Sequence, residues 1–580
     1  MKRMGAIVLL TVVAVWGVAA QDAPPLKAPQ RWYYVMTTIN DDAILAKQIE
    51  LAQRASRAGY TGVALYDCKF DKYKIRPANF DANFKKFRQA CTDNKLDFIA
   101  CVLPMGYCDM FLATDPNLAE GMPVRNAAFV VKDGRLVPVD DDLKLVNGSL
   151  DQFKDNQPVG WEATDPGNIS FMDETEKTQG TACLRQQDAQ QRGHARIQQK
   201  IAVKPFHYYH VSAMVKTLDC ESKDWRLQPY DGRYSLSWEM PPIEKTMGWK
   251  RVHMCFSSLD NTSILLQLGS WGAKGGKVWW DDVQIEPGGF VNLIRRDSLP
   301  LKIASEDGKT VYEEGKDFSE VKDAKFLNDP HPGYFSVWHD APVVTIPAAS
   351  RLKEGQRARA SYHIAMTAGK PTQIMCCMCE PKVYAKIEEQ MRWVKETLQP
   401  DGYFMMHDEI RQQGWDDSCV KSGKTCGQIL ADNVKRCTEI IEKVDPGKSI
   451  VVWQDMFDPF SNARKTDGND PFFSYLNRGE SPWQGSWEGL AKCVGAVNWN
   501  QGSEESYRYF SDNGHQQIIS GCKPNDIAAY LKKSGHLPGV AGIMYTTWDN
   551  DFSDNFEKYV EAAKQWEQET GGFGPSSPKQ

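Results

Sequence analysis

The stretch "VYAKIEEQMRWVKETLQPDGYFMMHDE", residues 383–409, joins two different hydrophobic patterns. Apolar residues recur every three or four positions in its first part, which predicts an amphipathic helix over 383–399. After a Pro-Asp-Gly turn, the apolar run 402–406 predicts a buried strand that ends directly in His407, Asp408 and Glu409. A helix followed by a buried strand is the repeating unit of a parallel α/β fold.

The same alternation of helix and strand occurs on both sides of this unit. Before it, strands are predicted at 32–38, 62–67 and 97–104. From it onward, they are predicted at 402–409, 449–457, 495–500, 515–521 and 540–548. Three strands before a long interruption and five after it give eight β/α units, the number that closes a TIM barrel. We therefore expect an α/β protein built on a (β/α)8 barrel.

The interruption has a different pattern, because helical periodicity disappears from about 147 to about 287. Short alternating strands at regular spacing replace it, which is typical of a β-sandwich. The runs "NGSLDQF" at 147–153 and "VWWDDVQIEP" at 278–287 resemble the jelly-roll modules appended to carbohydrate-active enzymes. The resemblance implies an all-β jelly-roll sandwich inserted after the third barrel strand. Many such modules are spacers, so it implies the fold more strongly than sugar binding.

These patterns divide the chain into consecutive segments. The predicted boundaries are a signal peptide at 1–20, barrel strands one to three within 21–145, the inserted sandwich at 146–290, a β-rich connector at 291–370, barrel strands four to eight within 371–570, and a tail at 571–580.

The N-terminus predicts export. "MKRMGAIVLLTVVAVWGVAAQ" places Lys2 and Arg3 before a short apolar run and small residues before Gln21, as in a signal peptide cleaved after Ala20. No later segment is long and apolar enough to span a membrane, so the mature chain is expected to be periplasmic or secreted. The net charge of −6 offers no basic stripe, and nucleic acid is therefore not an expected partner.

The 15 cysteines are predicted to be mainly buried thiols. An odd number leaves at least one unpaired in an exported protein, and Cys419 with Cys426 is a candidate disulfide. The run "CCMC" at 376–379 has the wrong spacing for a tetrahedral zinc site, so no metal is expected there. In the sandwich, Asp281 or Asp282 is a candidate ligand for a structural calcium ion, although a plain turn at the strand end explains the pair equally well.

The predicted barrel strands end in polar and aromatic residues. Active sites of TIM barrels lie at the carboxyl ends of their strands. Asp408 and Glu409 are therefore the candidate catalytic residues, against the alternative that they cap a helix or pair with Arg411. The candidate substrate-binding residues are His407, Arg411, Asp67, Trp453, Asp455, Asn498, Trp499, Tyr545 and Trp548. Carboxylates framed by aromatic rings and amides are what glycoside hydrolysis requires, since rings stack on sugars and a carboxylic acid protonates the departing oxygen.

The acidic pair at the end of the fourth strand resembles that of family-20 glycoside hydrolases, the β-N-acetylhexosaminidases. The resemblance implies substrate-assisted catalysis, in which Asp408 orients the 2-acetamido group and Glu409 is the general acid/base. It also implies that Trp548 and Trp453 form the apolar wall of the sugar pocket. Where the family usually has His-x-Gly-Gly before the pair, this chain has Met405, Met406 and His407.

Other functions remain open at this point. Adjacent strand residues point to opposite faces, so Glu409 and Asp455 could instead form an ordinary two-carboxylate pair. A non-catalytic glycan-binding protein on a degenerate barrel would keep the same aromatic cleft. A metal-assisted hydrolase could use Asp67, Glu409 and Asp455, although no paired ligand motif supports it. In each case we expect an oligosaccharide or polysaccharide partner, and outside the metal-assisted alternative we expect no cofactor.

Overall fold

The computed structural model describes residues 24–165, 169–187, 194–221, 225–233, 235–237, 243–271, 275–367, 369–466, 476–499 and 502–575. The predicted signal peptide, residues 1–20, and the end of the predicted tail, 576–580, lie outside these ranges. Within them, no helix combines the length and the apolar character that crossing a membrane requires.

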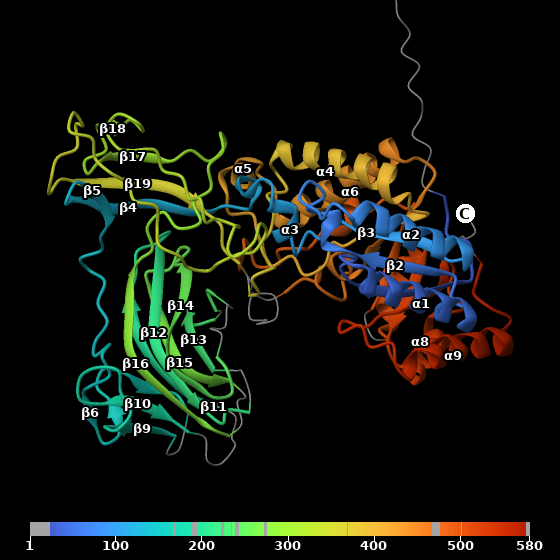
Figure 1. Ribbon diagram of the computed structural model, residues 1–580, viewed down its shortest axis with the longest axis horizontal. Coiled ribbons are helices and arrows are strands. Elements are labelled where there is room, and N and C mark those ends of the chain that lie inside the picture. The colour runs from blue at the N-terminus through green and yellow to red at the C-terminus, as the bar shows by residue number, and fades with distance from the viewer. Residues whose placement is uncertain are drawn as a thin grey trace, which may run out of the picture.

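A closed barrel of parallel strands forms one half of the molecule (Figure 1). Its strands follow one another in chain order, and each pairs in parallel with its neighbours. They are β1 (Gln30–Met36), β2 (Gly62–Tyr66), β3 (Asp97–Val102), β20 (Gly402–Met405), β22 (Ser449–Trp453), β24 (Val494–Asn498), β25 (Gln517–Gly521) and β26 (Val540–Tyr545). The prediction of three strands before the interruption and five after it is confirmed.

Helices follow most of these strands. They are α1 (Asp42–Ala58), α2 (Phe80–Asp93), α4 (Pro381–Trp393), α6 (Cys426–Val444), α7 (Glu504–Asp512), α8 (Pro524–Ser534) and α9 (Asn555–Thr570). The helix predicted over 383–399 is α4, prolonged by a π-helical turn over Val394–Leu398. Between β22 and β24 the described residues hold only short elements: η4 (Asp455–Phe457), β23 (Leu476–Asn477) and η5 (Ser486–Gly489).

Local sequence explains where these helices begin. In α6, the Thr425 side chain accepts a hydrogen bond from the Gln428 backbone while the Gln428 side chain caps in return. This reciprocal capping box satisfies N–H groups that a helix start otherwise leaves unpaired. In α1, the Asp41 side chain caps the first turn and Gly59, at φ 101°, ends the last one.

Alternate residues of the barrel strands face two different cores. Tyr34, Phe404 and Trp453 belong to a cluster inside the barrel, together with Trp32, Ala64, Ile99, Cys101, Met406, Val451, Val497, Ile518, Ala541 and Met544. Their strand neighbours Tyr33, Tyr403 and Val452 belong to the larger cluster under the helices. Because side chains of a strand alternate between faces, this register also determines where the residues beyond each strand end will point.

Two antiparallel sheets form the inserted β-region. One has the order β14-β12-β16-β10-β9 and the other β13-β15-β11-β8. Their strands are β8 (Glu162–Ala163), β9 (Ser170–Asp173), β10 (Cys183–Gln186), β11 (His194–Ala202), β12 (Tyr208–Leu218), β13 (Trp225–Tyr230), β14 (Met247–Ser257), β15 (Ser263–Trp271) and β16 (Lys277–Pro287). Residues of both sheets, such as Leu266 and Trp280, share one core. A small hairpin, β6 (Phe153–Lys154) with β7 (Gln157–Pro158), precedes them.

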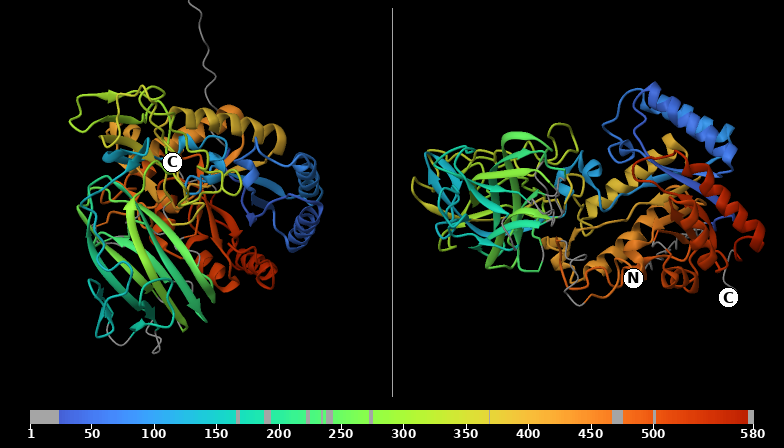
Figure 2. Two further views of the ribbon diagram at one scale, coloured as in Figure 1. Left: turned by 60° about the vertical axis from the view of Figure 1, so that its left-hand side comes forward. Right: turned by 90° about the horizontal axis from the view of Figure 1, so that it is seen from below.

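A third sheet joins residues that the sequence assigned to two separate segments. Its order is β18-β17-β19-β4-β5, with β4 (Met122–Lys132), β5 (Arg135–Pro138), β17 (Lys302–Ser305), β18 (Val311–Tyr312) and β19 (Arg357–Ile364). β4 and β5 lie within 21–145, the range predicted to hold barrel strands one to three, but they pair in this sheet and not in the barrel. The predicted connector, 291–370, supplies the other strands. Figures 1 and 2 show this sheet and the sandwich together on one side of the barrel.

Candidate active site

The acidic pair lies where the chain leaves β20 and turns sharply. Glu409 has a φ of 47°, in the left-handed region, so the strand register does not continue through the pair. The loop after β3 presses against this turn, because a Cβ added to Gly106 would stand 1.9 Å from the carbonyl oxygen of Asp408. The Glu409 backbone lies close enough to the Asp455 carboxylate to act on its pKa, in the direction that lowers it. The turn thus brings both members of the pair toward Asp455.

Glu409 is the most accessible of the three carboxylates, with 32% of its side chain exposed. The Tyr107 hydroxyl donates a hydrogen bond to its Oε2, and the Gln373 side-chain amide donates to the same oxygen at 3.1 Å. The Arg411 guanidinium lies 3.4 Å from Oε1. Donors from three segments of chain therefore fix the orientation of this carboxylate at the barrel mouth.

Asp408 and Asp455 are buried beside it. Burial raises the pKa of Asp455 to about 7, with the Glu409 charge adding to the rise and Arg411 and Asn462 opposing it. Burial also raises the pKa of Asp408 well above its ordinary value, and the charges of Asp455 and Glu409 act in the same direction. Coupled carboxyl groups with raised pKa values can hold and transfer protons near neutral pH.

Each buried carboxyl group keeps an unpaired oxygen. Asn462 donates to Asp455 Oδ2 at 2.5 Å, whereas Oδ1 of Asp455 and Oδ1 of Asp408 have no partner among the described residues. The indole N–H groups of Trp453 and Trp499 are likewise buried and unpaired. Buried polar atoms are normally satisfied, so a group of unpaired ones at a barrel mouth is a feature of binding sites.

Four aromatic rings pack against one another at these strand ends, and the Asp408 charge acts on one of them, Tyr34. Trp548 is 54% exposed and lies 5.8 Å from Tyr34, 5.7 Å from Trp453 and 6.2 Å from Trp499, measured between ring centroids. Tyr34 and Trp453 are themselves 5.9 Å apart. Tyr34 lies on β1 and Trp453 on β22, while Trp499 and Trp548 follow β24 and β26, so the rings form an apolar wall across one side of the mouth. Such a wall can stack against a sugar ring.

The other predicted site residues point away from the mouth. His407 is buried, bonds Asn433 of α6 at 2.9 Å, and burial lowers its pKa to about 4. Asp67 pairs with Lys69 at 2.6 Å and accepts the Ile39 N–H. These two residues, and the two described next, were expected to bind substrate, but their contacts are with the surrounding helices and loops.

Asn498 and Tyr545 also make their contacts outside the barrel mouth. The Asn498 amide donates to Ser506 of α7 at 3.0 Å and to Gln517 at 3.2 Å. The Tyr545 hydroxyl donates to the Asp551 carbonyl, and its ring packs against Tyr559 of α9. The strand register accounts for both, because each occupies a position that faces the helical layer rather than the barrel interior.

Sequence reasoning missed Tyr34, Gly106, Tyr107 and Gln373. Tyr34 could have been found by counting alternate residues along β1. Tyr107 and Gly106 carried a weaker signal, because "MGYC" follows a predicted strand end. The sequence around Gln373 gave no such signal, since this residue reaches Glu409 from the segment that returns from the insertion.

The predicted cation and disulfide sites have other partners. Asp281 accepts hydrogen bonds from the Thr178 backbone and hydroxyl, and Asp282 pairs with Arg251. Calcium there stays a prediction. All 15 cysteines are free thiols, so the candidate Cys419–Cys426 bond is not made, while the expectation of mainly buried thiols is confirmed. Among the described residues, one cluster of thiols and carboxylates is suited to a metal, and neither Asp408 nor Glu409 belongs to it.

No protein-family model matches the chain, and no curated protein matches it. Solved structures similar to it include a rhamnosidase from Novosphingobium sp. PP1Y, at 10% identity and a TM-score of 0.24, covering 91% of this chain and 56% of the other. A family 16 carbohydrate-binding module matches at 17% identity and a TM-score of 0.16, covering 24% of this chain and 96% of the module. The tandem GH20 modules of a pneumococcal exo-β-D-N-acetylglucosaminidase match at 10% identity and a TM-score of 0.22, covering 37% of this chain and 55% of the other. These neighbours are glycoside hydrolases and a carbohydrate-binding module, at TM-scores too low to bear on activity.

Proposed function

We propose that this chain is an exported glycoside hydrolase whose active site is the carboxyl end of the barrel. The observation that carries the proposal is the convergence of Asp408, Glu409 and Asp455 beside the wall of four aromatic rings. Glycosidic bonds are cleaved by paired carboxyl groups on either side of the bond, and the rings hold the sugar. The inserted sheets are proposed to be a jelly-roll module that assists or spaces the barrel.

The more specific proposal is hydrolysis of a terminal β-linked N-acetylhexosamine by substrate-assisted retention. In this scheme Glu409 protonates the departing glycosidic oxygen and later takes a proton from the attacking water. Asp408 orients the 2-acetamido group, whose oxygen attacks the anomeric carbon. The left-handed turn at Glu409 supports this division of roles, because it allows adjacent residues to face one site.

A second candidate is a two-carboxylate mechanism that uses Glu409 and Asp455. The closeness of the Glu409 backbone to the Asp455 carboxylate and the pKa of about 7 for Asp455 favour it, since Asp455 is then partly protonated at neutral pH and can serve as the acid. Glu409, held by Tyr107 and Gln373, would be the nucleophile or base. Buried Asp408 would support the site through its charge or its proton.

A panel of chromogenic glycosides, with and without a 2-acetamido group, tests these proposals. Substrate-assisted catalysis predicts turnover of the acetamido sugars alone and inhibition by a thiazoline that mimics the bicyclic intermediate. Turnover of sugars that lack the acetamido group, without thiazoline inhibition, would reject it in favour of Glu409 and Asp455. Full activity after exhaustive chelation would reject a metal-assisted hydrolase.

A further inference from the structure

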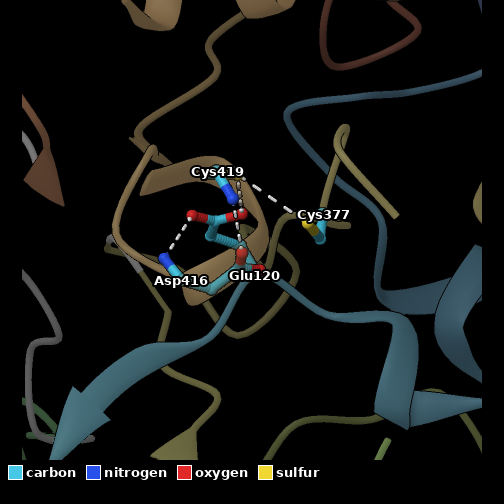
Figure 3. Close-up of side chains that lie close together, drawn as sticks. All are labelled: Glu120, Cys377, Asp416 and Cys419. Atoms are coloured by element: carbon cyan, nitrogen blue, oxygen red, sulfur yellow. Dashed lines mark hydrogen bonds between the residues drawn. The ribbon is translucent and has the colours of Figure 1, made fainter. Parts of the chain in front are cut away.

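A buried cluster of thiols and carboxylates lies where the barrel meets the insertion. Glu120 precedes β4, Cys377 precedes α4, and Asp416 and Cys419 stand at the start of α5 (Asp417–Lys421). All four are buried, and one donor atom of each lies within 4.8 Å of the others. Figure 3 shows the Glu120 carboxylate between the other three residues.

The spacing of these atoms matches the edges of a zinc coordination tetrahedron. With a Zn–S bond of about 2.3 Å and a Zn–O bond of about 2.0 Å, tetrahedral ligands stand about 3.8 Å apart for two sulfurs and about 3.5 Å for sulfur and oxygen. The Cys377 and Cys419 sulfurs are 3.8 Å apart, and Cys419 Sγ is 3.4 Å from Glu120 Oε2. A disulfide would require the sulfurs to move to about 2.05 Å.

The surroundings add two features that suit a cation held by anionic ligands. Glu120 and Asp416 bury two carboxylates, and Arg296, 2.5 Å from Asp416, is the cation that contacts this pair among the described residues. The fully buried Gln413 amide also points into the cluster, with Nε2 3.1 Å from Glu120 and 3.2 Å from the Cys419 sulfur. Its Oε1 has no partner.

We propose that Glu120, Cys377, Asp416 and Cys419 bind one Zn²⁺ ion. On binding, the two thiols each form a Zn–S bond and release one proton to solvent, so no electrons are transferred. The hydrogen bond that the Cys419 thiol donates to Glu120 is lost in this step, and the Glu120 oxygen becomes a ligand instead. The partly buried Cys379 thiol lies next to Cys419 but is not one of the four proposed ligands.

The site is a structural one by its position. Its ligands come from the segment that leaves the barrel, the segment that returns to it, and the loop that follows Glu409. A bound ion would join these three segments and hold the insertion against the barrel. The spacing of "CCMC" gave no sign of this, because only one ligand comes from that run. The proposal does not depend on the glycosidase assignment.

Metal binding to the full-length protein tests it. The protein is reduced, stripped with a chelator and titrated with Zn²⁺ or with Co²⁺, whose thiolate complexes absorb in the near ultraviolet and whose tetrahedral complexes absorb strongly in the visible. We expect one equivalent of either metal, a thiolate-to-cobalt band, and a higher melting temperature with zinc. Cys419→Ser and Glu120→Gln should each weaken binding at least tenfold.

Cys91→Ser is the matched control, because Cys91 is a buried thiol of α2 far from the cluster in the chain. It should bind zinc as the unsubstituted protein does, and circular dichroism reports whether each variant folds. Failure of the unsubstituted protein to bind one equivalent overturns the proposal regardless of the variants. A Cys377–Cys419 disulfide in protein prepared without reductant, seen as a two-hydrogen mass loss, overturns it as well.

Discussion

Gly106 is the single residue on which the position of the acidic pair most directly depends. Any side chain there would meet the Asp408 carbonyl oxygen and the Glu409 backbone, at 1.9 and 2.8 Å from a Cβ. The loop after β3 can approach this closely because Met105 and Met406 bond across the two strand ends. Glycine is thus required here for close packing rather than for its own torsion angles.

Gly106→Ala should therefore displace the acidic pair. We expect kcat to fall at least tenfold with a smaller change in KM, because a misplaced acid lowers transition-state stabilisation more than binding. Steady-state kinetics on a chromogenic glycoside measures this. Gly248→Ala is the control, since a Cβ there meets nothing within 4 Å. Equal kinetics for the two variants would show that the turn does not depend on Gly106.

Asp455 predicts a particular pH dependence of stability. Its pKa is about 7 in the folded protein and near 3.8 when the chain is unfolded. Between these values the folded state holds a proton that the unfolded state has lost, so the free energy of unfolding should fall as pH rises. The slope contributed by this one group is at most about 1.4 kcal/mol per pH unit.

Asp455→Asn should remove this contribution. Urea denaturation at intervals from pH 4 to pH 7 should give a flatter stability curve for the variant than for the unsubstituted protein. Asp512→Asn, at an exposed position of α7, serves as the control. If the curves of Asp455→Asn and the unsubstituted protein run parallel, the Asp455 carboxyl group is not the source of the slope.

At the scale of the elements, the strands were predictable and the directions of their last residues were predictable in principle. Buried runs between helical patterns gave all the barrel strands, because burial on both faces makes them continuously apolar. The alternation within β20 and β22 places Asp408 and Asp455 on the interior side with Met406 and Trp453. Treating every polar residue at a strand end as equivalent is what included His407 and Asn498.

The aromatic wall leads to a prediction about Trp548. This side chain is 54% exposed yet contacts three other rings, so its removal should cost stability only modestly, about 1 kcal/mol or less. Trp548→Ala should instead raise KM for a glycoside at least fivefold, because a stacking face for the sugar is lost. Tyr334→Ala, at another exposed aromatic side chain, should leave KM unchanged. Unchanged KM in Trp548→Ala would remove this ring from the binding site.

At the scale of the whole molecule, the sequence showed that an insertion exists but not how it is assembled. β4 and β19 pair although more than two hundred residues separate them in the chain. Local alternation identifies a strand and says nothing of its partner, so 21–145 and 291–370 were assigned to different units. The positions of Gln373 and Glu120 were unpredictable for the same reason, since both depend on how the chain enters and leaves the insertion.

The sandwich and the third sheet should unfold as one cooperative unit. Tyr208 and Cys255 of the sandwich belong to the core of the third sheet, and Trp338 stacks on His210 with ring centroids 3.6 Å apart. Trp338→Ala should lower the melting temperature of this unit, because the stacked pair spans the contact. Calorimetry measures the change, and turnover at 25 °C should stay the same. An unchanged melting profile would mean that Trp338 does not couple the two sheets.

The central claim is that Glu409 performs proton transfer on a bound glycoside. The most direct measurement compares Glu409→Gln with the unsubstituted protein, both for turnover of a cleaved chromogenic glycoside and for binding of the same sugar. The account predicts a loss of turnover of about 10²- to 10⁴-fold, with sugar affinity changed less than tenfold. Glu389→Gln, on the exposed side of α4, should keep full turnover. Sugar binding with no turnover in the unsubstituted protein would contradict the account and indicate a non-catalytic glycan-binding barrel.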